Sequence, residues 1–142
     1  MSAAAVVDRP TANDAVMSER VALVIEDSDD QRALLTHLLQ REQFRVLAFA
    51  DCESAAAAFG SFISRDGQGV DAPPVLAIID LLLPGLSGYE CAVLIRKHFP
   101  ICHLVISSVL DVLDYPESDA VLPKPITGAS VREVVAAMGL GR

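Results

Sequence analysis

The fold is decided by residues 21–30, VALVIEDSDD, in which five apolar residues end abruptly at two adjacent acids. A short, continuous apolar run of this kind is typical of a β-strand that is covered on both faces. Residues 75–80, VLAIID, repeat the pattern and again end at an acid. The two runs therefore predict two buried strands of a parallel sheet.

Segments with helical periodicity alternate with such strands along the chain. In the segment 29–41, four leucines lie on one helical face, and Ser28 or Asp29 can cap the start. A last helix, capped by Thr127 or Ser130, is predicted to end at Gly139. We expect strands at 21–25, 45–49, 75–79, 103–106 and 120–122, and helices at 29–41, from Asp51 to about Ile63, at 89–98 and from about 127 to 139. The alternation requires right-handed crossovers, so we expect an α/β fold with helices on both faces.

Two further expectations concern side chains on these helices. In the helix at 89–98, we expect four residues to face the core: Cys91, Val93, Leu94 and Phe99. In the last helix, the apolar stripe consists of Val131, Val134, Val135 and Met138. Both stripes would pack on the sheet.

Length and composition fit one folded domain. The chain has 142 residues, of which 52% are hydrophobic, and this is enough to bury a core. Residues 1–19 are rich in Ala, Ser and Asp, contain Pro10 and lack a sustained period, so we expect a mobile tail there. The domain proper is predicted at 20–142.

The net charge of −8 disfavours direct binding to nucleic acid or to an anionic membrane. No apolar run is long enough for a membrane span, and no signal peptide is recognisable. The three cysteines, Cys52, Cys91 and Cys102, are odd in number and show no metal-binding spacing. We therefore expect buried thiols and a cytoplasmic protein.

Polar residues collect where the predicted strands end. Glu26 and Asp27 follow the first strand, Asp80 follows the third, Ser107 the fourth and Lys124 the fifth. In an open parallel sheet these ends share one edge, and ligands bind there at the point where the strand order reverses. Three carboxylates in one crevice repel each other unless a proton or a cation relieves them. Mg²⁺ suits hard oxygen ligands, so it is the cofactor that we expect.

Together these groups are the parts that phosphoryl transfer requires. The metal ion and Lys124 would neutralise the phosphoryl oxygens, Ser107 would donate a hydrogen bond to one of them, and Asp80 would attack in line. Each residue also has a structural alternative. Asp80 could be a turn former, Glu26 and Asp27 could favour the start of the following helix, and Ser108 could replace Ser107.

Four motifs resemble those of the response-regulator receiver domains of two-component systems. They are Val24–Arg32 (VIEDSDDQR), Asp80–Glu90 (DLLLPGLSGYE), Val105–Ser108 (VISS) and Lys124–Pro125. Each motif alone is weak, but their common order after four strands is a specific signal. The resemblance extends over about residues 20–139.

The resemblance implies a flavodoxin-like (CheY-like) sheet of five parallel strands in the order 2-1-3-4-5. It implies that Asp80 accepts a phosphoryl group from a phosphohistidine of a sensor histidine kinase or a histidine phosphotransfer protein. The resemblance implies that the metal ion is bound by Glu26, Asp27, Asp80 and the backbone carbonyl of Leu82. It also implies that Ser107 and Lys124 contact the phosphoryl group. The family usually has a cis peptide bond between the lysine and the proline.

The chain departs from the family between its last two strands. Only 17 positions separate Ser107 from Lys124, so the fourth helix of the family must be shortened or missing. Val121 stands where the family usually has an aromatic switch residue. Leu82 and Val109 offer no polar side chain to orient water, which predicts slow hydrolysis of the phosphorylated form.

Three functions remain open. The first is a stand-alone receiver that signals through a downstream protein partner, either as a monomer or as a homodimer. It would help to catalyse its own phosphorylation and dephosphorylation, but it would not be an enzyme that acts on a separate substrate. The second is a pseudo-receiver, an interaction module without phosphorylation. The third is an Asp-nucleophile, Mg²⁺-dependent phosphohydrolase, which is disfavoured because Leu82 occupies the place of its second aspartate.

Overall fold

The computed structural model describes residues 20–62, 73–83, 85, 87–108 and 118–141. The strands are β2 (Val21–Ile25), β3 (Arg45–Phe49), β4 (Pro74–Asp80), β5 (His103–Ser108) and β6 (Ala120–Pro123). The helices are α2 (Asp29–Arg41), α3 (Cys52–Ala58), which continues into the 3-10 helix η1 (Phe59–Phe62), α4 (Gly88–His98) and α5 (Gly128–Ala137). Every strand and helix expected from the sequence is present, and within the described residues no bound differs from the expected one by more than two residues.

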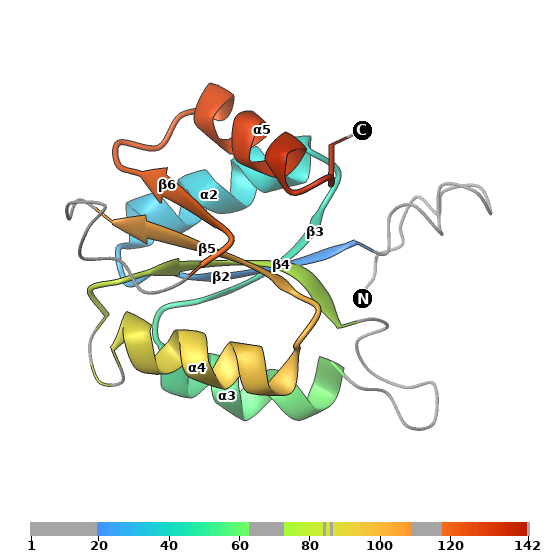
Figure 1. Ribbon diagram of the computed structural model, residues 1–142. Helices are drawn as coiled ribbons and strands as arrows, with labels where there is room; N and C mark the ends of the chain where they lie inside the picture. Colours follow the sequence, from blue (N-terminus) through green and yellow to red (C-terminus); the bar gives the residue numbers. More distant parts are fainter. Residues whose placement is uncertain (1–19, 63–72, 84, 86, 109–117, 142) are drawn as a thin grey trace, which may run out of the picture.

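All strands pair in parallel, in the order β3-β2-β4-β5-β6. Counted along the chain, this is the order 2-1-3-4-5, so the flavodoxin-like sheet is confirmed. Helices α2 and α5 cover one face of the sheet and helices α3 and α4 cover the other (Figure 1). The order reverses between β2 and β4, which places a ligand crevice at the carboxyl ends of these two strands.

The core has two halves because side chains alternate between the faces of each strand. In β2, Leu23 and Ile25 pack with the α3 and α4 side, whereas Ala22 and Val24 pack with the α2 and α5 side. All of β2 is fully buried, as its continuous apolar sequence predicts.

Side-chain caps set the starts of the helices. The Ser28 side chain accepts a hydrogen bond from the Gln31 backbone N–H, and Thr127 likewise caps α5, which resolves both alternatives left open by the sequence. Ser87 and Glu90 form a reciprocal capping box at α4. Such caps satisfy backbone N–H groups that have no partner within the helix.

The expected inward position of Val93 is wrong. Val93 is 68% exposed, while Ala92 and Ile95 are buried together with Cys91. Val93 lies about 200° around the helix axis from Cys91, because each residue advances the helix by about 100°. Cys91 and Phe99, which are both buried, were placed correctly.

The cysteine expectation is wrong for two of the three residues. Cys52 and Cys91 form a disulfide with a Cα–Cα distance of 5.8 Å, and Cys102 is a buried free thiol. Helices α3 and α4 pack side by side on one face of the sheet, and this brings together two cysteines that lie 39 positions apart. Sequence spacing carried no sign of that contact.

Several expectations fall on residues outside the described part of the chain. These are the mobile tail at 1–19, the helix end at Ile63, the shortened fourth helix of the family, and Val109. Of that connection the structure describes Ser118 and Asp119, which are not helical. Among the described helices, none is long and apolar enough to cross a membrane.

Candidate functional site

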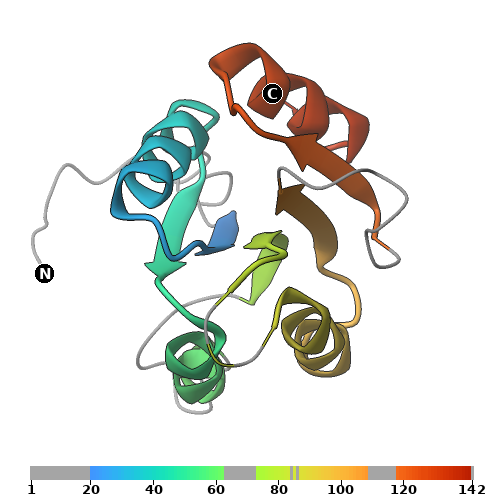
Figure 2. The same ribbon diagram turned by 90° about the vertical axis from the view of Figure 1, so that its left-hand side faces the viewer.

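The carboxyl edge of the sheet gathers the residues singled out by the sequence. Glu26 directly follows β2, Asp80 is the last residue of β4, Ser107 lies near the end of β5, and Lys124 follows β6. Register places Asp80 beside Ser107 and Ile25 beside Ile79. Figure 2 looks at the molecule from this edge.

Three carboxylates meet at the crevice. Carboxylate oxygens of Glu26, Asp27 and Asp80 lie within 4.8 Å of one another. Glu26 and Asp80 are buried, whereas Asp27 is exposed. Carboxylates at this spacing repel each other, and a hard divalent cation is the natural partner for such a set of oxygens. The donor set therefore fits Mg²⁺, as predicted.

Lys124 stands between two of these acids. Its Nζ lies 2.9 Å from Glu26 Oε1 and 3.2 Å from Asp80 Oδ2. Burial acts to lower the pKa of Lys124, but its contacts with Glu26 and Asp80 outweigh burial and raise that pKa above its ordinary value. Lys124 is thus held as an ammonium against the Asp80 carboxylate.

Glu26 is the acid that is shielded most from solvent, with 1% of its surface exposed. Burial raises the pKa of Glu26, and the contact with Lys124 only partly offsets this effect. The Ser28 backbone N–H donates to Glu26 Oε2 over 3.0 Å, and an Arg32 guanidinium nitrogen donates to the Glu26 carbonyl. Sequence analysis gave neither Ser28 nor Arg32 this positioning role, although both lie in the first motif.

The loop after Asp80 is held by two hydrogen bonds that backbone N–H groups donate. The Leu82 N–H donates to Asp80 Oδ1 over 3.0 Å, and the Gly88 N–H donates to the Leu81 carbonyl over 3.1 Å. A β-carbon at Gly88 would lie 2.5 Å from Leu81 Cα, so a larger residue has no room there. The sequence shows Gly88 only as one residue of the motif Asp80–Glu90, whereas the structure requires glycine for this close approach.

Ser107 is buried, and within the described part of the chain its hydroxyl has no hydrogen-bond partner. Buried hydroxyls are normally paired, so an unpaired one calls for a reason. Ser108 makes an interaction of its own. Of the two serines, Ser107 is therefore the better candidate for a hydroxyl that binds a ligand.

One feature of the receiver family and two departures from it are also visible. The peptide bond between Lys124 and Pro125 is cis, as the resemblance implied. Leu82, two residues after Asp80, is 56% exposed. Val121 is half-buried at the position where the family usually has an aromatic residue.

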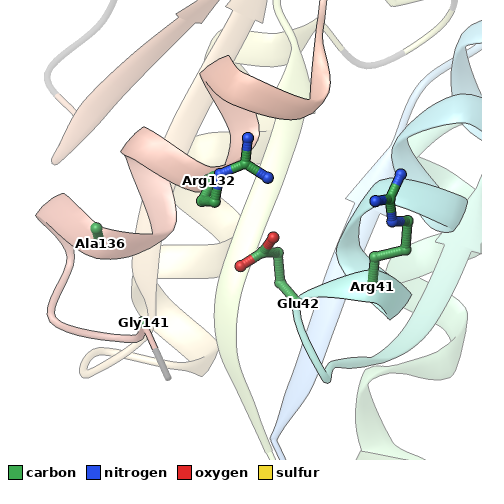
Figure 3. Close-up of a pocket in the computed structure, with 5 residues that line it drawn as sticks. All are labelled: Arg41, Glu42, Arg132, Ala136 and Gly141. Atoms are coloured by element: carbon green, nitrogen blue, oxygen red, sulfur yellow. The ribbon is translucent and has the colours of Figure 1, made fainter.

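A pocket of about 350 Å³ lies elsewhere in the molecule (Figure 3). Its lining consists of Arg41, Glu42, Arg132, Ala136 and Gly141. Arg41 ends α2, whereas the carboxylate cluster lies at the start of that 13-residue helix, about 20 Å away along its axis. None of the predicted site residues lines this pocket, so its size does not identify the functional site.

Comparison with known proteins gives the following sequence relationships. No protein-family model matches the chain. A regulatory protein, VanRc of Enterococcus gallinarum, is 36% identical over 84 residues, which cover 58% of this chain and 32% of that protein. The chain therefore spans about a third of the length of this curated relative.

Solved structures share the fold over most of the chain. The response regulator TrrA of Thermotoga maritima, solved with Mg²⁺ and BeF, has a TM-score of 0.68 at 24% identity, covering 84% of this chain and 98% of that one. The chemotaxis response regulator CheY4 of Vibrio cholerae has a TM-score of 0.70 at 17% identity, with the same coverage. The chain has the fold of response-regulator receiver domains, and the sequence match to VanRc supports the resemblance that its motifs suggested.

Proposed function

We propose that this chain, whose fold and motifs are those of response-regulator receiver domains, accepts a phosphoryl group on Asp80. One observation carries the proposal. The buried Asp80 carboxylate lies within the three-acid cluster, bonds to Lys124, and neighbours Ser107, whose hydroxyl has no partner among the described residues. The donor would be a phosphohistidine of a sensor kinase or of a phosphotransfer protein.

Glu26, Asp27, Asp80 and the Leu82 carbonyl would hold Mg²⁺, which neutralises charge on the phosphoryl oxygens when it is bound. Asp80 then attacks phosphorus, so that a new O–P bond forms as the P–N bond to the donor imidazole breaks. The imidazole leaves with the electron pair of that bond and takes a proton. The result is a phosphoaspartate on this chain and a free histidine on the donor.

Lys124 and Ser107 serve the transferred group. Lys124 Nζ lies 3.2 Å from Asp80 Oδ2, so a phosphoryl group built on Asp80 comes within reach of the ammonium. The Ser107 hydroxyl, which lacks a partner in the described residues, would donate to another phosphoryl oxygen. Both groups would stabilise the negative charge of the transferred group.

The fate of the phosphoaspartate would be slow hydrolysis. Leu82 presents an apolar side chain beside the acceptor, where a polar one would orient an attacking water. The chain would therefore act as a phosphorylated signal that a downstream protein partner reads. In this role it serves as a phosphoacceptor in the cytoplasm and does not turn over a separate substrate.

A pseudo-receiver without phosphorylation is the second candidate. Val121, half-buried at the aromatic position, favours it because valine has no large ring to alternate between exposed and buried states. The phosphohydrolase reading has less support, because Leu82 provides no second acid beside Asp80.

The test is intact mass after incubation with Mg²⁺ and acetyl phosphate. We expect the mass of one phosphoryl group to be added, and we expect Asp80→Asn to abolish the addition. Asp30→Asn is the matched control, because Asp30 is exposed near the site but lies outside the three-acid cluster. Failure of the wild type to gain mass, with the fold intact, would support the pseudo-receiver.

A further inference from the structure

The disulfide between Cys52 and Cys91 joins the starts of two helices near the carboxylate cluster. Cys52 is the first residue of α3, and Cys91 lies in the first turn of α4. Both residues are fully buried. Helices α3 and α4 begin on the side of the molecule where β4 ends (Figure 1), so the cross-link lies on the side of the acceptor.

On the α4 side, backbone hydrogen bonds lead from the disulfide to the loop between Asp80 and α4, which we call the acceptor loop. The Cys91 N–H donates to the Ser87 carbonyl over 2.9 Å. The next residue, Gly88, donates to the carbonyl of Leu81, which directly follows Asp80. The first turn of α4 is thus tied to the residue beside the acceptor.

On the α3 side, a similar path leads to the acid pocket. The Glu26 N–H donates to the Phe49 carbonyl over 3.0 Å, and Phe49 lies three residues before Cys52. Glu53, which follows Cys52, lies against the acceptor loop, because a β-carbon at Gly85 would collide with its carboxylate. The cross-link therefore connects the segment that holds Glu26 to the segment that holds Asp80.

We infer that Cys52 and Cys91 are a redox couple whose disulfide fixes the acceptor loop, so that oxidised and reduced protein bind Mg²⁺ with different affinity. The disulfide closes a ring that contains β4 and the loop after Asp80. Opening it frees α4 to move relative to α3, and with it the loop that orients Asp80 and the Leu82 carbonyl. Any consequence for phosphorylation rests on the proposed function, whereas the effect on the loop does not.

The chemistry is thiol–disulfide exchange with a small disulfide of the glutathione class. A thiolate of one cysteine attacks the external disulfide, forming a mixed disulfide and releasing one small thiol. The second cysteine then attacks the protein sulfur of that mixed disulfide and releases the second small thiol. Two protein thiols are oxidised, one external disulfide is reduced to two thiols, and the protons from the cysteines end on those thiols.

Burial sets the rate of this exchange and keeps Cys102 out of it. Neither Cys52 nor Cys91 is exposed, so a reagent reaches them only when α3 and α4 separate locally. Burial raises the pKa of the Cys102 thiol to about 12, so Cys102 remains a neutral, poorly reactive thiol. Disulfides that do form in cytosolic proteins are usually transient and catalytic or redox-sensing.

The first experiment counts thiols. The full chain is equilibrated with oxidised glutathione or with dithiothreitol, denatured, alkylated and weighed. We expect one labelled cysteine, Cys102, after oxidation and all three after reduction. Labelling of Cys52 and Cys91 in the oxidised sample would overturn the inference.

The second experiment compares the two redox forms by amide hydrogen exchange and by Mg²⁺ titration. In reduced protein we expect faster exchange at residues 81–83 and 87–91 and a several-fold larger dissociation constant for Mg²⁺. The double variant Cys52→Ala/Cys91→Ala should behave like the reduced wild type and ignore dithiothreitol. Cys102→Ala, the matched control, should respond to dithiothreitol as the wild type does.

Equal exchange and equal Mg²⁺ affinity in both redox forms of the wild type would contradict the inference. Unfolding of the reduced wild type, seen by circular dichroism, would contradict it as well, since the disulfide would then be a requirement of the fold. The wild-type comparison decides the question even if the double variant does not fold. Redox-dependent Mg²⁺ binding without any phosphorylation would refute the proposed function alone.

Discussion

The ammonium of Lys124 lies 3.2 Å from the carboxylate of Asp80, although 44 positions separate the two residues in the chain. The same ammonium lies 2.9 Å from Glu26. In the protein without metal, Lys124 is thus the cation that offsets the crowded acids. Parallel strand order produces this contact, because β6 ends at the same edge of the sheet as β2 and β4.

Replacement of Lys124 by alanine should destabilise the metal-free protein, because Glu26 and Asp80 would lose their shared counter-charge. We expect a loss of about 2 kcal/mol in the free energy of unfolding, below the usual cost of breaking a fully buried pair because Lys124 is partly exposed. Chemical denaturation in EDTA measures the loss, and added Mg²⁺ should restore part of it. Lys97→Ala, at the exposed end of α4, is the control. Equal free energies of unfolding for the two variants would show that the contacts of Lys124 with Glu26 and Asp80 do not stabilise the protein.

Magnesium affinity should depend on pH through Glu26. Burial raises the pKa of Glu26, so this side chain takes up a proton at a pH where an ordinary glutamate is ionised. As the pH falls through that raised pKa, the proton competes with Mg²⁺ and the affinity falls; as the pH rises, the affinity increases. Calorimetric titration at several pH values measures this dependence. Glu26→Gln should bind Mg²⁺ more weakly and lose this part of the pH dependence; an unchanged pH profile in the variant would exclude Glu26 from the site.

Gly88→Ala should disturb the acceptor loop. The added β-carbon would lie 2.5 Å from Leu81 Cα and 2.7 Å from the Asp80 carbonyl oxygen, so the backbone must shift. We expect a loss of about 2 kcal/mol in unfolding free energy and weaker Mg²⁺ binding. Gly60→Ala is a matched control, since a β-carbon there meets nothing within 4 Å. If both variants behave alike, the close approach at Gly88 does not constrain the loop.

Leu82→Asn should speed the decay of the phosphorylated protein several-fold, because an amide at this exposed position can orient water toward phosphorus. The backbone N–H of residue 82, which donates to Asp80 Oδ1, is retained in the variant. Decay is followed by intact mass after removal of the phosphodonor. Val93→Asn places the same amide on the exposed face of α4 and should leave the decay rate unchanged. An unchanged rate in Leu82→Asn would mean that other residues control access of water.

Much of the fold could be predicted because its signals are local. The apolar run at 21–25 ends at two acids, and the structure buries that run completely. The site could also be predicted in outline, since parallel strands bring their ends to one edge whatever their spacing in sequence. These parts of the structure follow from hydrophobic periodicity and from the order of strands and helices along the chain, and both can be read from the sequence.

Contacts between helices could not be predicted in the same way. Cys52 and Cys91 meet because α3 and α4 pack side by side, and no spacing rule encodes that arrangement. Val93 was misplaced because several apolar residues of α4 compete for the buried face and only the helix rotation selects among them. Likewise, the sequence does not show that the buried Ser107 hydroxyl lacks a partner among the residues that the structure describes.

Our proposal that Asp80 carries the phosphoryl group is tested most directly by finding which residue of the chain is phosphorylated. Protein treated with Mg²⁺ and acetyl phosphate is reduced with borohydride, which converts a phosphoaspartate to homoserine, and is then digested and sequenced by mass spectrometry. If Asp80 carries the phosphoryl group, we expect homoserine at position 80 and unmodified side chains at Glu26 and Asp27. Homoserine at another aspartate, or none in protein that binds Mg²⁺ and remains folded, would contradict it.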